Sequence, residues 1–172
     1  MIVDLARLSG GRLRTGFTIG PDDPLLDGYG GRIDEPIRLE VEVTSATGGM
    51  YVVAVDVYGK SVGSCRRCLI PVEVTIDDRC RVVYQHSDGA GNDFGDTDIV
   101  PIERKATEIE IDKPVRERLF LERNRFPLCD GECAGICAQC GQNLNQGRCN
   151  CASDETDERW SALGALMLDD QG

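Results

Sequence analysis

The chain of 172 residues is 41% hydrophobic and 28% charged, only 5% of its residues are aromatic, and its formal net charge is −11. This composition is typical of one globular domain, and the sequence has no run of 18 apolar residues that could form a transmembrane helix. The net acidity argues against sequence-independent binding along a phosphate backbone, although it allows a local basic contact. The first seven residues do not resemble a signal peptide, so we expect a soluble, cytoplasmic protein.

Glycine, aspartate and proline dominate residues 1–34, which predicts an irregular N-terminal arm with one short strand near Phe17–Ile19. Residues 35–128 then alternate apolar and polar side chains, the period of half-buried strands. Turns are expected at Gly48-Gly49, Gly59-Lys60 and Asp77-Asp78. The predicted strands are Ile37–Val43, Met50–Tyr58, Ser61–Ser64, Ile70–Ile76, Arg79–Tyr84 and Ile109–Ile111. These segments predict an antiparallel meander or a partly open barrel.

The meander is expected to be followed by an acidic loop at residues 85–101 and then by a helix. Asp112 suits the N-cap and a proline follows in the first turn, so the helix is predicted from Asp112 to about Asn124. Val115 and Leu119 lie four residues apart and are expected to face the sheet. The sequence therefore predicts the α+β class.

Few large apolar side chains occur in residues 129–151, which hold six of the nine cysteines. Such a segment cannot easily offset its ordering entropy by burial, so we expect it to be a cysteine-rich zinc segment. Residues 152–172 predict a short helix at Glu155–Leu168 and an acidic tail. These parts are expected to form one structural unit.

The cysteine pattern is the strongest signal in the sequence. No export signal accompanies the nine cysteines, and an odd number cannot pair completely, so thiolates held by a metal are expected rather than disulfides. Two thiolates separated by two residues on a tight turn can face one Zn²⁺, and four complete a tetrahedron. Gly141 directly follows such a turn, where a positive φ lets backbone N–H groups point at sulfur. The candidate ligands are Cys65, Cys68, Cys129, Cys133, Cys137, Cys140, Cys149 and Cys151.

Eight cysteines fit two zinc sites of four thiolates each, which leaves Cys80 as a small apolar residue in a strand. Their division between the sites has two solutions. In the first, the hairpin pair Cys65 and Cys68 meets Cys137 and Cys140, and the other four form the second site. In the second, the hairpin pair joins Cys129 and Cys133, and the other four form a local site. A single metal with the remaining thiols free is a third possibility.

Catalytic patterns are weak in this sequence. Four thiolates per site leave no open position for a metal-bound water, so metal-assisted hydrolysis is not expected. His86 lies in a loop without a catalytic partner in its surroundings, and Gly89–Gly95 lies among aspartates rather than before a helix with lysine. We therefore expect neither an enzyme nor a small-molecule substrate.

Several motifs together resemble the YceD-like family, the large ribosomal RNA subunit accumulation proteins. The resemblance covers roughly residues 35–168, and its motifs occur in the family's order. They are Cys65-Arg66-Arg67-Cys68-Leu69-Ile70-Pro71-Val72, Ile111-Asp112-x-x-Val115-Arg116-Glu117, Pro127-Leu128-Cys129, Cys133-x-Gly135-Ile136-Cys137-x-x-Cys140-Gly141-x-Asn143-Leu144-Asn145, Cys149-x-Cys151 and Asp157-x-Arg159-Trp160-x-x-Leu163.

The resemblance implies a non-enzymatic factor in ribosome biogenesis, needed for accumulation of large-subunit rRNA, and it points to the same eight cysteines as metal ligands. Its expected partner is large-subunit rRNA or a pre-ribosomal particle, reached directly or through a ribosomal protein, and no membrane. The arginines that we expect to contact rRNA phosphates or an acidic partner are Arg66, Arg67, Arg116, Arg118, Arg123 and Arg125.

Three alternatives stand beside this hypothesis. These arginines could instead pair with nearby acids or neutralise thiolate charge within the protein. The chain could be a protein-only adaptor with structural zinc and no direct RNA contact. A thiol oxidoreductase or metal carrier would need a labile metal or a thiol of low pKa.

Overall fold

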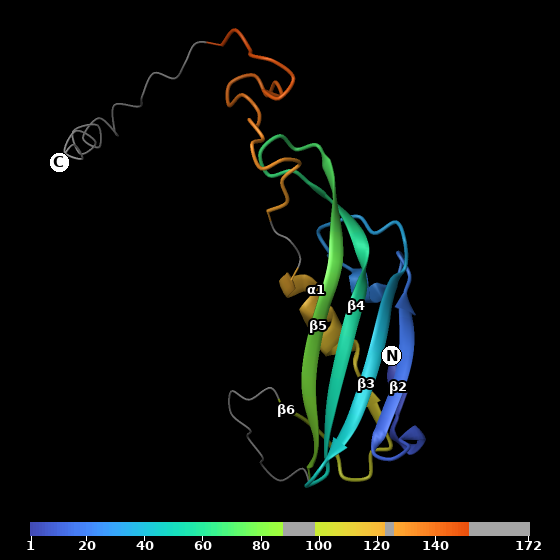
Figure 1. The fold of residues 1–172 in the computed structure, drawn as a ribbon. Coiled ribbons are helices and arrows are strands. Elements are labelled where there is room, and N and C mark those ends of the chain that lie inside the picture. The colour runs from blue at the N-terminus through green and yellow to red at the C-terminus, as the bar shows by residue number, and fades with distance from the viewer. Residues whose placement is uncertain (88–98, 123–125, 152–172) are drawn as a thin grey trace, which may run out of the picture.

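The computed structural model describes residues 1–87, 99–122 and 126–151 of the chain (Figure 1). Strands are the commonest regular elements among these residues, and one α-helix follows them in the sequence. The strands are β1 (Ile2–Asp4), β2 (Arg12–Ile19), β3 (Ile37–Ala46), β4 (Met50–Ser64), β5 (Pro71–Ser87), β6 (Ile99–Glu103) and β7 (Glu108–Glu110). The helical elements are the short 3-10 helices η1 (Leu5–Arg7) and η2 (Pro24–Leu26) and the α-helix α1 (Asp112–Glu122).

Five strands form the main sheet in the order β2-β3-β4-β5-β6. Neighbours from β2 to β5 are antiparallel, whereas β6 runs parallel to β5. A second, two-stranded sheet pairs β1 with β7. The predicted α+β class is confirmed. The antiparallel pairing of β3, β4 and β5 agrees with the expected meander, whereas the parallel strand β6 is not among the predicted strands.

The long hairpin of β4 and β5 carries the first candidate ligands. These strands pair without interruption from Met50 with Gln85 to Ser64 with Pro71, so the turns predicted at Gly59-Lys60 and Asp77-Asp78 are wrong. Gly59 is required for packing rather than for a turn, because a Cβ there would lie 3.1 Å from Cγ1 of Ile37.

The hairpin extends beyond the rest of the sheet. β3 pairs with β4 only as far as Tyr58, and beyond that position β4 and β5 continue as a two-stranded ribbon (Figure 1). Cys65 and Cys68 lie in the turn at its tip. The hairpin thus carries the first pair of candidate ligands away from the sheet and toward residues 126–151.

The N-terminal arm is more regular than the sequence predicts. Instead of one short strand at Phe17–Ile19, β2 runs from Arg12 to Ile19 and pairs with β3 along its whole length. Leu13 and Ile19 are buried in the core. Thr15 interrupts the apolar alternation between them, which explains why the sequence pattern reveals only the end of the strand.

The hydrophobic core lies between the main sheet and a layer formed by α1, β1 and β7. Alternate valines of β3 and β4 fill it from the sheet, and Val115 and Leu119 of α1 are buried against them, as predicted. The other fully buried side chains of this core are Val3, Ile19, Ile37, Leu39, Ile109 and Ile111. Among the described residues, no helix is both long and apolar enough to cross a membrane.

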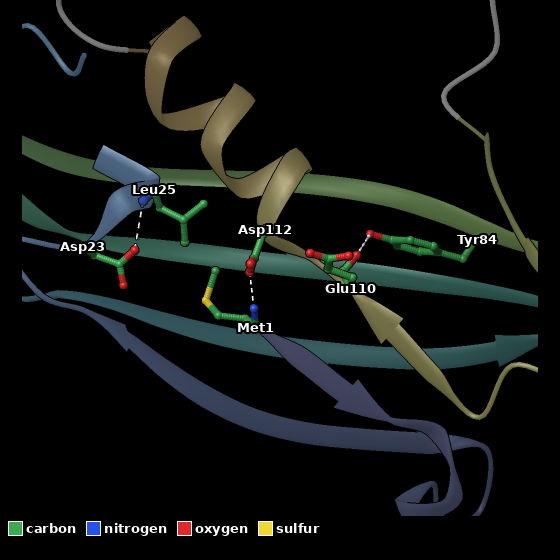
Figure 2. Close-up of polar contacts among 6 residues, drawn as sticks. All are labelled: Met1, Asp23, Leu25, Tyr84, Glu110 and Asp112. Atoms are coloured by element: carbon green, nitrogen blue, oxygen red, sulfur yellow. Dashed lines mark hydrogen bonds and ion pairs between the residues drawn. The ribbon is translucent and has the colours of Figure 1, made fainter. Parts of the chain in front are cut away.

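Polar contacts hold α1 and the neighbouring segments in place (Figure 2). The amino group of Met1 forms an ion pair with the carboxylate of Asp112 at the first turn of α1. The hydroxyl of Tyr84 donates a hydrogen bond to the carbonyl of Glu110 over 2.8 Å, which ties β5 to β7. These contacts fix the start of α1 over the sheet, and hence the point from which residues 126–151 depart.

Two further predictions concern the acidic loop and the last helix. The loop expected at 85–101 is shorter, because its first three residues belong to β5 and its last three to β6. Residues 88–98 and the predicted helix at Glu155–Leu168 lie outside the described residues.

Candidate metal centre

Four thiols from two distant parts of the chain meet at the tip of the long hairpin. Cys65 and Cys68 come from the turn between β4 and β5, and Cys129 and Cys133 come from the segment after α1. The Sγ atoms of Cys65 and Cys133 are 3.9 Å apart, and those of Cys68 and Cys129 are 3.5 Å apart. All four Sγ atoms lie within 4.8 Å of one another. We call this group the first cluster.

A second group of four thiols lies within residues 137–151. Cys137, Cys140, Cys149 and Cys151 place their Sγ atoms within 4.8 Å of one another. This second cluster is more open to solvent: Cys140 is exposed and the other three are half-buried, whereas three cysteines of the first cluster are buried. The structure therefore groups the eight cysteines in the second of the two arrangements that the sequence allows.

The two Cys-x-x-Cys turns share one backbone geometry. In the first turn, the N–H of Leu69 donates to the carbonyl of Cys65 over 2.9 Å. The N–H of Cys65 donates to the carbonyl of Ile70 over 2.8 Å. In the second turn, the N–H groups of Gly141 and Cys137 make the equivalent bonds over 2.9 and 2.8 Å. Both turns leave backbone N–H groups available to the sulfur atoms they enclose.

These N–H groups change the acidity of the thiols. Hydrogen bonding from the backbone of the second cysteine in each turn lowers the pKa of Cys65 and of Cys137 to about 6. In the opposite direction, a hydrogen bond with the second cysteine of the adjacent turn raises the pKa of Cys129 and of Cys151 to about 12. Each cluster thus crowds thiolate-forming groups together, and a bound cation would neutralise the resulting charge.

The donor set and its dimensions fit zinc. A tetrahedral ion with Zn–S distances of 2.3 Å separates its ligand sulfurs by about 3.8 Å, and the measured separations of 3.5 and 3.9 Å lie on either side of that value. Four thiolates and no harder ligand suit a soft or borderline metal rather than Mg²⁺ or Ca²⁺. Both clusters could therefore hold a metal ion with a closed, four-thiolate shell.

Groups around the first cluster support its geometry. The guanidinium of Arg67 donates to the carbonyls of Gly131 and Cys133 over 3.2 and 3.0 Å. The side-chain amide of Asn145 donates to the Sγ of Cys133 over 3.3 Å. Sequence reasoning missed this role of Asn145. The signal was the pair Asn143 and Asn145, because asparagines at this spacing favour side-chain to backbone turns.

The structure places the predicted contact arginines in different surroundings. Arg66 stacks over the ring of Phe126, with its guanidinium carbon 4.5 Å from the ring centroid. Arg116 donates to the carbonyls of Leu25 and Asp27. Arg118 forms a bidentate ion pair with the carboxylate of Asp78 in β5, over 2.6 and 2.7 Å.

The structure describes four of the six predicted arginines. Arg123 and Arg125 fall outside the described residues. Of the four that are described, Arg66 and Arg67 lie at the hairpin tip and Arg116 and Arg118 lie on α1. Protein groups engage Arg67, Arg116 and Arg118 directly.

Cys80 belongs to neither cluster. It lies in β5, half-buried against the hydrophobic core, and burial raises the pKa of its thiol. This placement agrees with the apolar role expected for it.

Comparisons with known proteins match the chain to one family. Residues 53–167 match the family model described as large ribosomal RNA subunit accumulation protein YceD. A chloroplastic large ribosomal RNA subunit accumulation protein, YCED homolog 1 of Arabidopsis thaliana, is 41% identical over 59 residues, which are 34% of this chain and 18% of that protein. No solved structure matches the chain.

Longer matches come from mycobacteria. An uncharacterized protein of Mycobacterium tuberculosis is 29% identical over 131 residues, 76% of this chain and 62% of that protein. An uncharacterized protein of Mycobacterium leprae is 26% identical over 137 residues, 78% of this chain and 61% of that protein. The chain thus matches less than two thirds of the length of each of these relatives.

Proposed function

Since this chain belongs to the YceD family of large ribosomal RNA subunit accumulation proteins, we propose that it is a non-enzymatic, zinc-binding factor that promotes the accumulation of large-subunit rRNA and the assembly of the ribosome. The expected partner is large-subunit rRNA or a pre-ribosomal particle, which the chain reaches directly or through a ribosomal protein. Two structural zinc ions, one in each cluster, would hold its tip in a fixed shape.

The observation that carries this proposal is the first cluster. It joins Cys65 to Cys133 and Cys68 to Cys129, across 68 and 61 positions of sequence. A metal held there would fasten the hairpin tip to the segment after α1, which has few apolar residues of its own. We call this link between the hairpin tip and the segment after α1 the clamp. The region that matches the family model includes both of its parts.

The closed thiolate shells support a structural rather than a catalytic metal. Catalytic zinc keeps one position for water or substrate, whereas four cysteines complete the tetrahedron. Each cluster offers four thiols whose Sγ atoms lie within 4.8 Å of one another. The metal in this proposal therefore stabilises a surface and carries out no reaction.

One observation favours the second candidate function, a protein-only adaptor without direct RNA contact. Of the four described arginines proposed for phosphate contact, three are engaged within the protein, since Arg67 and Arg116 bind backbone carbonyls and Arg118 binds a carboxylate. In this candidate the protein acts on rRNA through a bound protein. Treatment of a purified complex with ribonuclease distinguishes the two, because an adaptor complex survives it.

Depletion of the protein tests the proposal. We expect the ratio of large- to small-subunit rRNA to fall, and the wild-type chain to restore it. The double variant Cys65→Ser with Cys68→Ser should not restore the ratio, whereas Cys80→Ser should, because Cys80 lies outside both clusters. An unchanged rRNA ratio on depletion would contradict the proposed function.

A further inference from the structure

Exposed apolar side chains gather around the first cluster. Of the eight large apolar side chains that are exposed among the described residues, five lie in the segments that this cluster joins. We call them the tip patch: Leu69, Ile70, Phe126, Leu128 and Ile136. Single exposed apolar residues are normal on a protein surface, but a group of them at one end of a molecule indicates an interaction site.

Backbone contacts bring the segments of the tip patch together. The N–H of Arg66 donates to the carbonyl of Pro127 over 2.9 Å, and a Cβ built on Gly135 would lie 3.2 Å from the carbonyl of Arg67. A hollow of about 250 Å³ next to these contacts is lined in part by Leu69 and Pro127. These contacts hold together the segments that carry the tip patch.

Leu69 has a backbone conformation that is unfavourable for leucine. Its φ is +63°, and among the described residues it is the one non-glycine with a positive φ. At the equivalent place in the second turn the chain has Gly141, with a φ of +73°. Leucine strains this conformation, whereas glycine adopts it freely. The leucine side chain is also 61% exposed, so packing within the described structure does not explain its presence.

The charge around the patch indicates what would cover it. A four-thiolate zinc ion in the first cluster would carry a net charge of roughly −2, and Asp130 and Glu132 are exposed on the segment between its ligands. Arg66 and Arg67 are exposed in the hairpin turn, and the negative charges of the zinc site and the two acids outweigh these two positive ones. RNA phosphates would be repelled from such a surface, whereas a basic protein with an apolar side chain would complement it.

We propose that the tip patch is the docking surface for a basic protein, with Leu69 as its central apolar anchor. This inference rests on the proposed function, and within it assigns contact with the ribosomal particle to a protein rather than to rRNA. The strained turn presents the leucine, the clamp keeps the turn rigid, and the surrounding acidic groups select a basic partner. A rigid apolar anchor of this kind typically carries much of the binding energy of an interface.

Two variants of Leu69 separate docking from folding. Leu69→Gly removes the anchor and relieves the backbone strain, and Leu69→Asn replaces it by a polar residue that tolerates positive φ. We expect both variants to be at least as stable as the wild type, yet to bind purified large ribosomal subunits about tenfold or more weakly in co-sedimentation. Leu121→Gln, on α1, is the matched control because Leu121 is 63% exposed, and it should bind like the wild type.

A photo-crosslinking amino acid at position 69 of the full-length chain identifies the class of partner. The probes are large ribosomal subunits, the proteins stripped from them, and protein-free large-subunit rRNA. A crosslink to a basic polypeptide supports the inference. A crosslink to rRNA, no crosslink at all, or unchanged binding by Leu69→Asn overturns it while the proposed function stands. If the wild-type chain fails to bind the subunits, the proposed function is contradicted, and crosslinking to the stripped proteins then decides the docking inference by itself.

Discussion

The side-chain amide of Asn145 donates a hydrogen bond to the Sγ of Cys133, over 3.3 Å. A bridge between Ile136 and Asn143 closes the loop that contains the second Cys-x-x-Cys turn, and Asn145 lies two residues after this bridge. The side-chain oxygen Oδ1 of Asn145 also accepts a hydrogen bond from the N–H of Ala134 over 2.7 Å. One residue thus connects the segment of the second cluster to a ligand of the first.

Replacing this residue should weaken metal binding in the first cluster. We expect Asn145→Ala to lower the zinc affinity of that cluster about tenfold or more, because ligands that lose an orienting hydrogen bond bind metal less tightly. Competition with a chromophoric chelator measures the affinity. Gln146→Ala is the control, since that side chain is exposed. Equal zinc affinities for the two variants would contradict the orienting role of Asn145.

The ion pair between Arg118 and Asp78 should stabilise the packing of α1 on β5. We expect Arg118→Met to lower the free energy of unfolding by about 1–2 kcal/mol at pH 7. Arg14→Met should change it by less than about 0.5 kcal/mol, because Arg14 meets Glu42 at an exposed position. Urea unfolding of both variants measures the difference, and equal effects would contradict this assignment.

The effect of Arg118→Met should depend on pH in one direction. The Arg118 guanidinium lowers the pKa of Asp78 in the folded state. The ion pair therefore contributes fully above the unfolded carboxyl pKa of about 3.9, and its contribution is lost as the pH falls through the lower, folded pKa. The stability difference between wild type and variant should shrink below about pH 4. A difference that stays constant to lower pH would be inconsistent with this linkage.

Two glycines near the first cluster should respond differently to a methyl group. Gly135 has a φ of +79°, and a Cβ there would lie 3.2 Å from the carbonyl oxygen of Arg67. Gly131 has no atom within 4 Å of such a Cβ. We expect Gly135→Ala to destabilise the tip by about 1–2 kcal/mol, and Gly131→Ala to change it by less than about 0.5 kcal/mol. Protection of the first-cluster thiols from alkylation reports the stability of the tip, and equal protection in both variants would refute the packing argument.

Loss of each cluster should have a distinct effect on the sheet. Cys65→Ser with Cys68→Ser removes a long-range link, so we expect the free energy of unfolding to fall by about 2–4 kcal/mol. Cys137→Ser with Cys140→Ser removes only a local site and should leave unfolding of the sheet, followed by circular dichroism, within about 0.5 kcal/mol of wild type. Equal destabilisation by both pairs would show that the second cluster also supports the sheet.

The sequence predicts the strands of the sheet better than their lengths. The alternation in β3 identifies a strand because its apolar residues all face the core. Gly59 and Asp78 are misread as turn residues because local propensity cannot show that a neighbouring strand packs against a glycine or that an arginine of α1 meets the aspartate. Strand continuity in β4 and β5 depends on these long-range contacts.

The candidate site shows the same division between local and long-range information. The spacing of each Cys-x-x-Cys pair fixes its own turn, so these pairs are readable from the sequence. Which Cys-x-x-Cys pair meets Cys129 and Cys133 depends on where α1 ends and on how the segment after it returns to the hairpin tip. The spacing of the cysteines in the sequence determines neither. The strain at Leu69 can be inferred only by comparing the two turns, because Leu69 occupies the position after the first Cys-x-x-Cys that glycine occupies after the second.

Metal content per folded chain tests the central claim most directly. Protein purified without chelator or added zinc should contain about two zinc ions by elemental analysis, and the Cys137→Ser, Cys140→Ser variant should contain about one. All eight cluster thiols of the wild type should resist alkylation until the metal is removed. A folded wild-type chain that contains no metal, with its cluster thiols freely alkylated, would contradict the account.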